Sequence, residues 1–238
     1  MNSVLEVFEA ILFDMDGVII DTKEPVEAFW NEKMELYDVT IDDNYLESKI
    51  HGRPARSIID DLFPHLSKKE RDDLDDECAL YDSSAEEYKI MPGVEPLLLT
   101  LQKSAVPFGL VTSALPPKVS VMQESLSIAN PFLTVVTADL ISNGKPDPEC
   151  YLLGAKKLGI DIEKILVFED SVSGVTSAHR AGATVIGVNS PGIAPMLADA
   201  GAKVVIEDFT GARWDANTNV LGFSNLSYQA KIIPSKTV

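Results

Sequence analysis

Residues 11–18 read Ile-Leu-Phe-Asp-Met-Asp-Gly-Val, an apolar run that ends in two carboxylates one residue apart. Alternate side chains of a strand share a face, so Asp14 and Asp16 can point into one site where a strand ends. An ordinary strand entering an ordinary turn has the same pattern, because Asp and Gly are common turn residues. The stretch therefore predicts a strand, and the rest of the chain must decide between a catalytic pair and a turn.

Composition narrows the class of protein. The chain has 238 residues, a formal net charge of −17 and 45% hydrophobic residues, which is ample for a buried core. The negative charge disfavours nucleic acid and anionic membrane surfaces as partners, but it permits a small anionic substrate that meets a local positive group. Cys78 and Cys150 have neither metal-binding nor disulfide-framework spacing. Because we find no basic leader and no apolar stretch of transmembrane length, we expect a cytoplasmic protein. We also expect a monomer or weak dimer.

Residues 20–88 have the pattern of a helical block. Apolar side chains recur at intervals of three and four and predict a first helix: Val26, Phe29, Trp30, Met34 and Tyr37. Three more helices are predicted, over 42–49, 55–63 and 67–88. The last of them begins with Ser67 and Glu70, which have the spacing of a capping box.

From Met91 onward, short apolar runs alternate with amphipathic helices. The predicted strands are 107–111, 133–136, 164–168, 184–188 and 203–206, and residues 9–14 supply one more. The predicted helices are 93–104, 116–127, 148–158, 172–181 and 193–200. This alternation predicts an α/β fold whose parallel sheet is covered by helices on both faces, with the helical block inserted after the first strand. Residues 212–223 are expected to form a hairpin.

Ligands of such sheets bind beyond the carboxyl ends of the strands. Polar pairs follow three of the predicted strands: Asp14 with Asp16, Thr112 with Ser113, and Glu169 with Asp170. A lysine, Lys145, stands in the loop before another helix, where Asp147 suits the N-cap and Pro148 the first helical position. The sequence therefore predicts one polar site at this edge of the sheet.

The carboxylates of this site predict a magnesium centre. Asp14, Asp16 and Asp170, with Glu169 beside them, offer the hard oxygen ligands that Mg²⁺ prefers. Ser113 or Thr112 can hydrogen-bond a phosphate oxygen. Two carboxylates then suit phosphoryl transfer, one as the nucleophile that forms an aspartyl-phosphate and one as the acid that protonates the leaving alcohol.

Four short motifs stand in order along the chain: Asp14-x-Asp16-Gly17-Val18, Thr112-Ser113, Gly144-Lys145-Pro146-Asp147-Pro148 and Glu169-Asp170-Ser171-x-x-Gly174. In order and spacing they resemble the motifs of the haloacid dehalogenase (HAD) superfamily of aspartate-nucleophile phosphatases. The resemblance covers nearly the whole chain and implies a Rossmann-like core, residues 1–19 and 89–238, with an inserted α-helical (C1-type) cap domain, residues 20–88. It implies a Mg²⁺-dependent phosphatase, a phosphoric monoester hydrolase.

The resemblance also implies a role for each motif residue. Asp14 is the nucleophile, and Asp16 is the general acid/base whose backbone carbonyl also binds Mg²⁺. The metal ligands are Asp14, Asp16 and Asp170, with Glu169 as a further or indirect ligand. Ser113, or else Thr112, binds the phosphate, and Lys145 balances the charge between the phosphate and a carboxylate.

A loop of the helical block offers candidate substrate contacts. Residues 51–57 read His-Gly-Arg-Pro-Ala-Arg-Ser and resemble the specificity loop of the family, in which Arg56, Arg53 and His51 would bind the substrate. A surface loop with two solvated arginines has the same pattern.

Two other functions stay open. Enzymes of the β-phosphoglucomutase type also form an aspartyl-phosphate, but they carry a histidine at the position of Val26, four residues after Thr22. A non-catalytic regulatory or binding protein on the same scaffold is the second alternative. Several segments look especially like fungal glycerol-3-phosphate and 2-deoxyglucose-6-phosphate phosphatases: 28–30, 51–52 with Arg56, 112–113, 144–146 and 167–170. This resemblance favours a sugar or polyol phosphate, a small phosphorylated metabolite, as the substrate.

Overall fold

A computed structural model describes residues 5–41, 50, 55–224 and 226–234. Its centre is a six-stranded parallel sheet in the order β4-β3-β2-β5-β6-β7. The strands are β2 (Ala10–Phe13), β3 (Phe108–Val111), β4 (Thr134–Val136), β5 (Ile165–Glu169), β6 (Thr184–Val188) and β7 (Val204–Ile206). The predicted Rossmann-like α/β fold is therefore confirmed, and each of these strands lies within two residues of its predicted bounds.

Helices cover both faces of this sheet. One face packs on α5 (Val94–Lys103) and α6 (Pro116–Ser125), and the other on α7 (Glu149–Leu158), α8 (Val172–Ala181) and α9 (Ala194–Ala200). Two short 3₁₀ turns, Ala138–Leu140 and Ile162–Lys164, lie in the connections. In β2, Ile11 and Phe13 enter one hydrophobic cluster while Ala10 and Leu12 enter the other. The continuous apolar run was thus a strand buried on both faces.

A second sheet joins the two ends of the chain. Its order is β1-β10-β9-β8, formed by Glu6–Phe8, Gln229–Ile232, Val220–Phe223 and Ala212–Asp215. The predicted hairpin is confirmed as the antiparallel pair β8 and β9. Strand β1 was not predicted: the chain leaves the second sheet at Phe8 and enters the central sheet at Ala10, where the strand predicted over 9–14 is found. Pairing of β1 with β10 is a contact between residues more than 200 positions apart, for example Glu6 and Ala230, and a local pattern does not report it.

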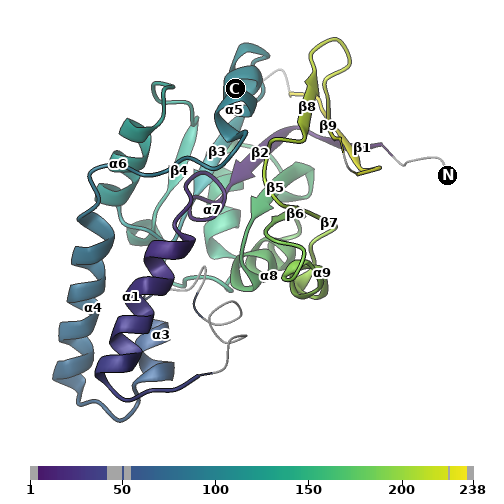
Figure 1. Cartoon of the computed structure of the whole chain (residues 1–238). Coiled ribbons are helices and arrows are strands. Elements are labelled where there is room, and N and C mark those ends of the chain that lie inside the picture. The colour runs from purple at the N-terminus through teal and green to yellow at the C-terminus, as the bar shows by residue number, and fades with distance from the viewer. Residues whose placement is uncertain (1–4, 42–49, 51–54, 225, 235–238) are drawn as a thin grey trace.

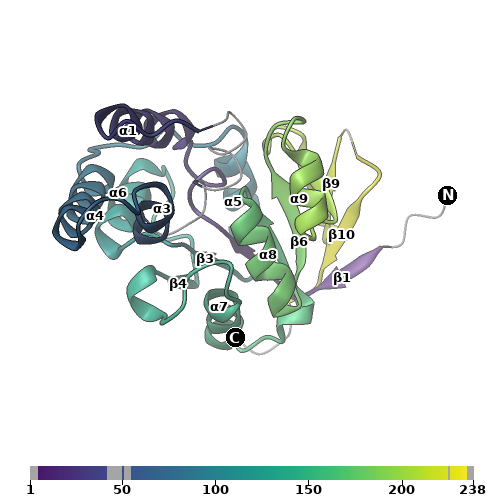
Figure 2. The ribbon, with the colours of Figure 1, turned by 90° about the horizontal axis from the view of Figure 1, so that it is seen from below.

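The helical insertion has a hydrophobic core of its own. It contains α1 (Lys23–Leu36), α3 (Ala55–Leu62) and α4 (Lys68–Ser83), packed around buried side chains such as Phe29, Trp30 and Phe63. Figures 1 and 2 both place these helices at one end of the central sheet and the second sheet at the opposite end. The helix predicted over 42–49 lies outside the described residues. Among the helices that the structure describes, none is both long and apolar enough to cross a membrane.

The capping box at the start of α4 is confirmed. The Ser67 hydroxyl accepts a hydrogen bond from the Glu70 N–H (3.3 Å), and the Glu70 carboxylate accepts one from the Ser67 N–H (2.8 Å). The end of this helix was predicted too late, since α4 stops at Ser83 instead of residue 88. The following residues cross back to the core beside the outgoing segment, where the Asp21 N–H donates to the Lys89 carbonyl (2.8 Å). Residues 84–89 are therefore non-helical and lead from the end of α4 to this pairing.

Candidate active site

Three adjacent strands bring the predicted polar residues to one edge of the central sheet. Strand β2 lies between β3 and β5, with Phe13 beside Leu110 on one side and Phe168 on the other. All residues of these three strands are buried. The first polar positions after each strand therefore meet at the same edge, as the sequence predicted.

Lys145 forms the centre of the site. Its ammonium group donates to Asp14 Oδ1 and to Glu169 Oε1, at 2.5 Å in each case, and all three side chains are buried. A buried charge is costly unless it is paired and hydrogen-bonded. One lysine here partners two carboxylates from neighbouring strands, so the three groups form one electrostatic unit.

Glu169 is held by more contacts than the sequence indicated. Besides Lys145, its Oε1 accepts a hydrogen bond from the Tyr151 hydroxyl (2.9 Å), while Oε2 accepts from the Ser171 N–H (3.1 Å) and hydroxyl (3.2 Å). A Cβ at position 174 would overlap this carboxylate, so Gly174 makes room for it. Since both oxygens already accept two hydrogen bonds, Glu169 is better suited to orient Lys145 than to bind a metal directly.

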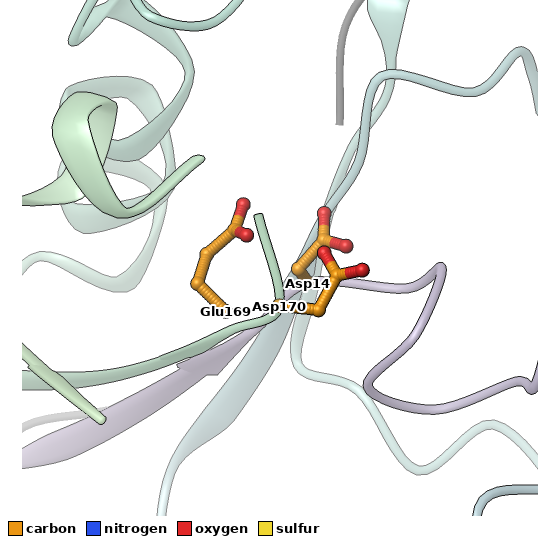
Figure 3. Close-up of side chains that lie close together, drawn as sticks. All are labelled: Asp14, Glu169 and Asp170. Carbon is orange, nitrogen blue, oxygen red and sulfur yellow. The ribbon is translucent and has the colours of Figure 1, made fainter. Parts of the chain in front are cut away.

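A divalent cation fits the other carboxylates. One oxygen each of Asp14, Glu169 and Asp170 lies within 4.8 Å of the other two, and Figure 3 shows the Asp14 and Asp170 carboxylates side by side with Glu169 apart from them. Within the described part of the chain, Asp170 Oδ1 is buried without a hydrogen-bond partner. Gly17, at φ +70°, lies where a Cβ would overlap Asp170. The close approach of this loop, the all-oxygen donor set and the unpartnered oxygen match a hard cation.

Burial dominates the electrostatics of these carboxyls. It raises the pKa of Asp14 to about 8, although the Lys145 ammonium opposes the shift, and Glu169 and Asp16 add to it by repulsion. Burial, together with Glu169 and Asp14, also raises the pKa of Asp170 well above its ordinary value. Three acidic groups share one lysine here, so the cluster needs further positive charge before all of them can ionise.

Asp16 faces a lysine that the sequence analysis did not single out. Lys118, near the start of α6, places its ammonium 2.8 Å from Asp16 Oδ1 as a close ion pair. Lys118 is buried, whereas Asp16 is half-buried. A cation is unfavourable near a helix N-terminus, and this was the one local signal that marked the residue as unusual.

The predicted phosphate-binding pair divides into one buried and one accessible residue. Thr112 is buried, and its hydroxyl accepts a hydrogen bond from the Ala114 N–H (3.0 Å). Ser113 is half-buried at the end of β3. Ser113 is thus the more available of the two hydroxyls.

The loop that carries Lys145 differs slightly from the prediction. Helix α7 begins at Glu149, so Pro148 is its N-cap residue and not its first helical residue. Asp147 still binds the helix start, because its Oδ1 accepts a hydrogen bond from the Glu149 N–H (3.0 Å). The helix starts one residue later than predicted, because the Asp147 carboxylate accepts its hydrogen bond from the N–H two residues further on, as in an Asx turn.

Arg56, the predicted substrate contact that the structure describes, makes no described hydrogen bond or ion pair with the carboxylates at the strand ends. The Arg56 guanidinium binds Asp60 (3.2 Å), four residues further along α3, and Asp72 (2.6 Å) on α4. These two acids raise the pKa of Arg56. Arg53 and His51 lie outside the described residues.

A family model described as haloacid dehalogenase-like hydrolase matches residues 11–188, from β2 through β6. The chain belongs to this family. The matched segment contains the three strands that carry the site as well as the helical insertion.

Known proteins of similar sequence and structure agree with this. The validoxylamine A 7'-phosphate phosphatase of Streptomyces hygroscopicus subsp. limoneus is 32% identical over 87% of this chain and 97% of its own length. The 2-deoxyglucose-6-phosphate phosphatase 1 of Saccharomyces cerevisiae is 30% identical over 84% of this chain and 87% of its own length. A Bacillus subtilis β-phosphoglucomutase is 26% identical over 83% of this chain and 88% of its own length. The crystal structure of a hydrolase from Pseudomonas syringae superposes with a TM-score of 0.73 and 27% identity, covering 84% of this chain and 94% of that one.

The comparisons confirm the predicted family, fold and enzyme class, a phosphoric monoester hydrolase. In this HAD-like hydrolase the sequence analysis missed two residues that touch the site, Tyr151 and Lys118. Tyr151 points from α7 at Glu169, and no motif spacing marks it, because an apolar helix face predicts an aromatic residue equally well.

Proposed function

We propose that this HAD-like hydrolase is a Mg²⁺-dependent phosphatase of sugar or polyol phosphates that acts through an aspartyl-phosphate on Asp14. The observation that supports it most is the bridge from Lys145 to Asp14 and Glu169, formed beside Asp16 and Asp170 at the ends of adjacent strands. A carboxylate oriented by a lysine and surrounded by oxygen ligands suits attack on a phosphate ester.

In the first step Asp14 attacks phosphorus. Lys145 holds Oδ1 of Asp14, so Oδ2 is the oxygen that forms the new bond. The bond from phosphorus to the ester oxygen breaks, its electron pair stays with that oxygen, and Asp16 supplies the proton of the departing alcohol. In the second step Asp16 takes a proton from water, which attacks the same phosphorus and releases inorganic phosphate and Asp14.

Mg²⁺ would be held by Asp14, Asp170 and the Asp16 carbonyl, with Glu169 acting indirectly through Lys145. Bound there, Mg²⁺ neutralises charge between the carboxylates and the phosphate. Ser113 would donate a hydrogen bond to a phosphate oxygen, with Thr112 shaping the turn through its bond to the Ala114 N–H.

We also propose that residues 20–88 act as a cap over a core of residues 1–19 and 89–238. Its two connections to the core run side by side, with Ile20 bridged to Ile90 and Lys89 paired with Asp21 (2.6 Å). A cap that closes excludes water while the aspartyl-phosphate forms and opens to admit it afterwards. Arg56, Arg53 and His51 as substrate contacts, and a cytoplasmic monomer or weak dimer, stay predictions.

A sugar phosphomutase is the second candidate, supported by the β-phosphoglucomutase among the relatives. Val26 disfavours a mutase, because the resemblance places a histidine at this position in the mutases. A mutase returns the phosphoryl group to a sugar, so it would convert substrate into an isomer with little free phosphate.

The deciding experiment measures phosphate release and isomer formation together, across sugar and polyol phosphates, with and without Mg²⁺. Wild-type protein is expected to release phosphate only with Mg²⁺, and Asp14→Asn is expected to lose at least about 10³-fold in rate while staying folded. Asp16→Asn is expected to accumulate phosphoenzyme. Substantial Mg²⁺-dependent release by Asp14→Asn would contradict the proposal, and Arg56→Ala with unchanged KM and substrate preference would remove Arg56 from the site.

A further inference from the structure

Lys118 is a buried lysine near the start of a helix, a position where a positive charge is unfavourable unless nearby groups stabilise it. It is 6% exposed and lies near the N-terminus of α6, where both burial and the helix dipole disfavour a cation. The groups near its ammonium include Asp16 Oδ1 at 2.8 Å and the ring of Tyr88, whose centroid is 5.9 Å away. The position is therefore maintained through contacts with the acid/base residue and with the segment that connects the insertion to the core.

Lys118 also lines a pocket of about 370 Å³ between the insertion and the core. Its other walls include Thr22 and Val26 at the start of α1, Tyr81 near the end of α4, and Tyr88. Pockets that hold small molecules have volumes of roughly 300–1,000 Å³. Lys118 lines this pocket and also pairs with Asp16, so one side chain connects the pocket with the group that would meet a leaving alcohol.

We propose that Lys118 is a positioning residue that aims the Asp16 carboxyl at the leaving-group oxygen, while the alcohol part of the substrate occupies this pocket. The proposal rests on the proposed function. Lys118 forms an ion pair with Oδ1 of Asp16 (2.8 Å), and this pairing leaves Oδ2 as the oxygen that reaches the ester. The proton passes from Asp16 to that oxygen as the phosphorus–oxygen bond breaks, and Lys118 neither gives nor takes a proton.

The effect of such positioning depends on the leaving group. Nitrophenolate departs without a proton, whereas phenolate is a poorer leaving group and gains from a well-aimed acid. Phenyl phosphate and 4-nitrophenyl phosphate have nearly the same shape. Their kcat/KM values report only the steps up to departure of the alcohol, so hydrolysis of the phosphoenzyme does not enter the comparison.

The test measures both kcat/KM values for wild type, Lys118→Met and Lys118→Arg with saturating Mg²⁺. Lys118→Met is expected to lose about 30-fold on phenyl phosphate and less than about threefold on 4-nitrophenyl phosphate, a part of the 10²–10⁴-fold typical of general acid catalysis. Lys118→Arg, which keeps a charged donor, is expected to restore the ratio of the two values to within about threefold of wild type. Should Lys118→Met not fold, Lys118→Gln carries the same comparison.

Lys33→Met is the matched control. Lys33 is another buried lysine that pairs with a carboxylate, Glu77 (2.5 Å), and lies over an aromatic ring, Phe29 (5.1 Å), but it belongs to the interior of the insertion. Its loss is expected to leave the ratio of the two kcat/KM values unchanged. Equal losses on both esters for Lys118→Met, or no loss on either, would overturn the proposal. Failure of the proposed function would appear separately, as absent activity in wild type or full activity in Asp14→Asn.

Discussion

The central sheet and the helical insertion both contain a basic side chain shared by two carboxylates, but the two groups differ in burial. In the core, the side chains of Lys145, Asp14 and Glu169 are 2%, 6% and 0% exposed. In the insertion, those of Arg56, Asp60 and Asp72 are 38%, 45% and 46% exposed. The pairing chemistry is the same, and the surroundings decide what it does.

Exposed ion pairs add little stability, because water and salt screen them and ordering long side chains costs entropy. Buried ion pairs carry a large desolvation penalty, and a protein that only required stability would gain as much from apolar packing. The chemistry proposed at Asp14 would account for the buried network of Lys145, while the exposed network of Arg56 requires no such explanation. The following predictions test this contrast.

The largest difference is expected between Lys145→Met and Arg56→Met. Loss of Lys145 leaves Asp14 and Glu169 buried without their cation, and breaking a buried pair in this way costs about 3–5 kcal/mol. Loss of Arg56 leaves carboxylates that water solvates, so the free energy of unfolding should scarcely change. Urea unfolding of the metal-free proteins measures both. Equal destabilisation by the two variants would show that burial does not distinguish the networks.

The next prediction concerns pH and Mg²⁺. Burial raises the pKa of Asp14 to about 8, from an ordinary value of 3.8 that an unfolded chain keeps. Between these values the folded state binds more protons than the unfolded state, so the stability of metal-free protein falls as pH rises. Mg²⁺ bound at the proposed site would compensate the charge of the ionised carboxylates, so its effect on Tm is expected to be larger at about pH 8.5 than at about pH 6.

Asp170→Asn serves as the control for this measurement, because it should remove most of the Mg²⁺ response without touching the exposed acidic groups. A Tm increase of the same size at both pH values would mean that the buried carboxylates are not the groups that bind the ion.

Two tyrosines sharpen the comparison further. Tyr151 donates to Glu169 (2.9 Å) beside Lys145, and Tyr228 donates to Glu6 (3.0 Å) in the second sheet. Each Tyr→Phe change removes one hydrogen bond to a carboxylate, worth about 1.5–3 kcal/mol when the carboxylate is buried. Tyr151→Phe is expected to lower kcat about tenfold at unchanged KM, because Glu169 then holds Lys145 less firmly. Tyr228→Phe is expected to leave both kcat and KM unchanged. A similar loss of kcat in both variants would show that Tyr151 does not act specifically through Glu169 and Lys145.

The smallest effect is expected at the capping box of α4. Ser67→Ala should lower the free energy of unfolding by about 1 kcal/mol, with no change in activity. Hydrogen bonds from Ser67 lower the pKa of Glu70, so its contribution is present above its ordinary value of 4.5 and is lost as pH falls below it. The difference between wild type and Ser67→Ala should shrink accordingly in acid. Ser84→Ala, at the other end of α4, provides the control. An equal loss in the free energy of unfolding for Ser84→Ala would show that the capping box contributes no more than any serine at a helix end.

Local patterns predicted most of the elements because their causes are local. Five helices and six strands of the core lie within two residues of the predicted bounds, since apolar periodicity and turn residues act over a few positions. The exceptions are contacts between distant segments. Strand β1 pairs with β10, and residues 84–88, which were predicted as helix, lead from α4 to the pairing of Lys89 with Asp21. Both contacts join residues that no local window contains.

The sequence by itself determined which residues stand at the strand ends. Asp14, Thr112 and Glu169 each follow a run too apolar to be anything but buried, and parallel strands end at one edge. Only the tertiary structure decided which side chains meet there. Lys145 reaches Asp14 across 131 positions and Lys118 reaches Asp16 across 102, because the packing of α6 and α7 on the sheet sets those distances. Composition and spacing specify a side chain's chemistry, but its partner depends on how whole elements pack.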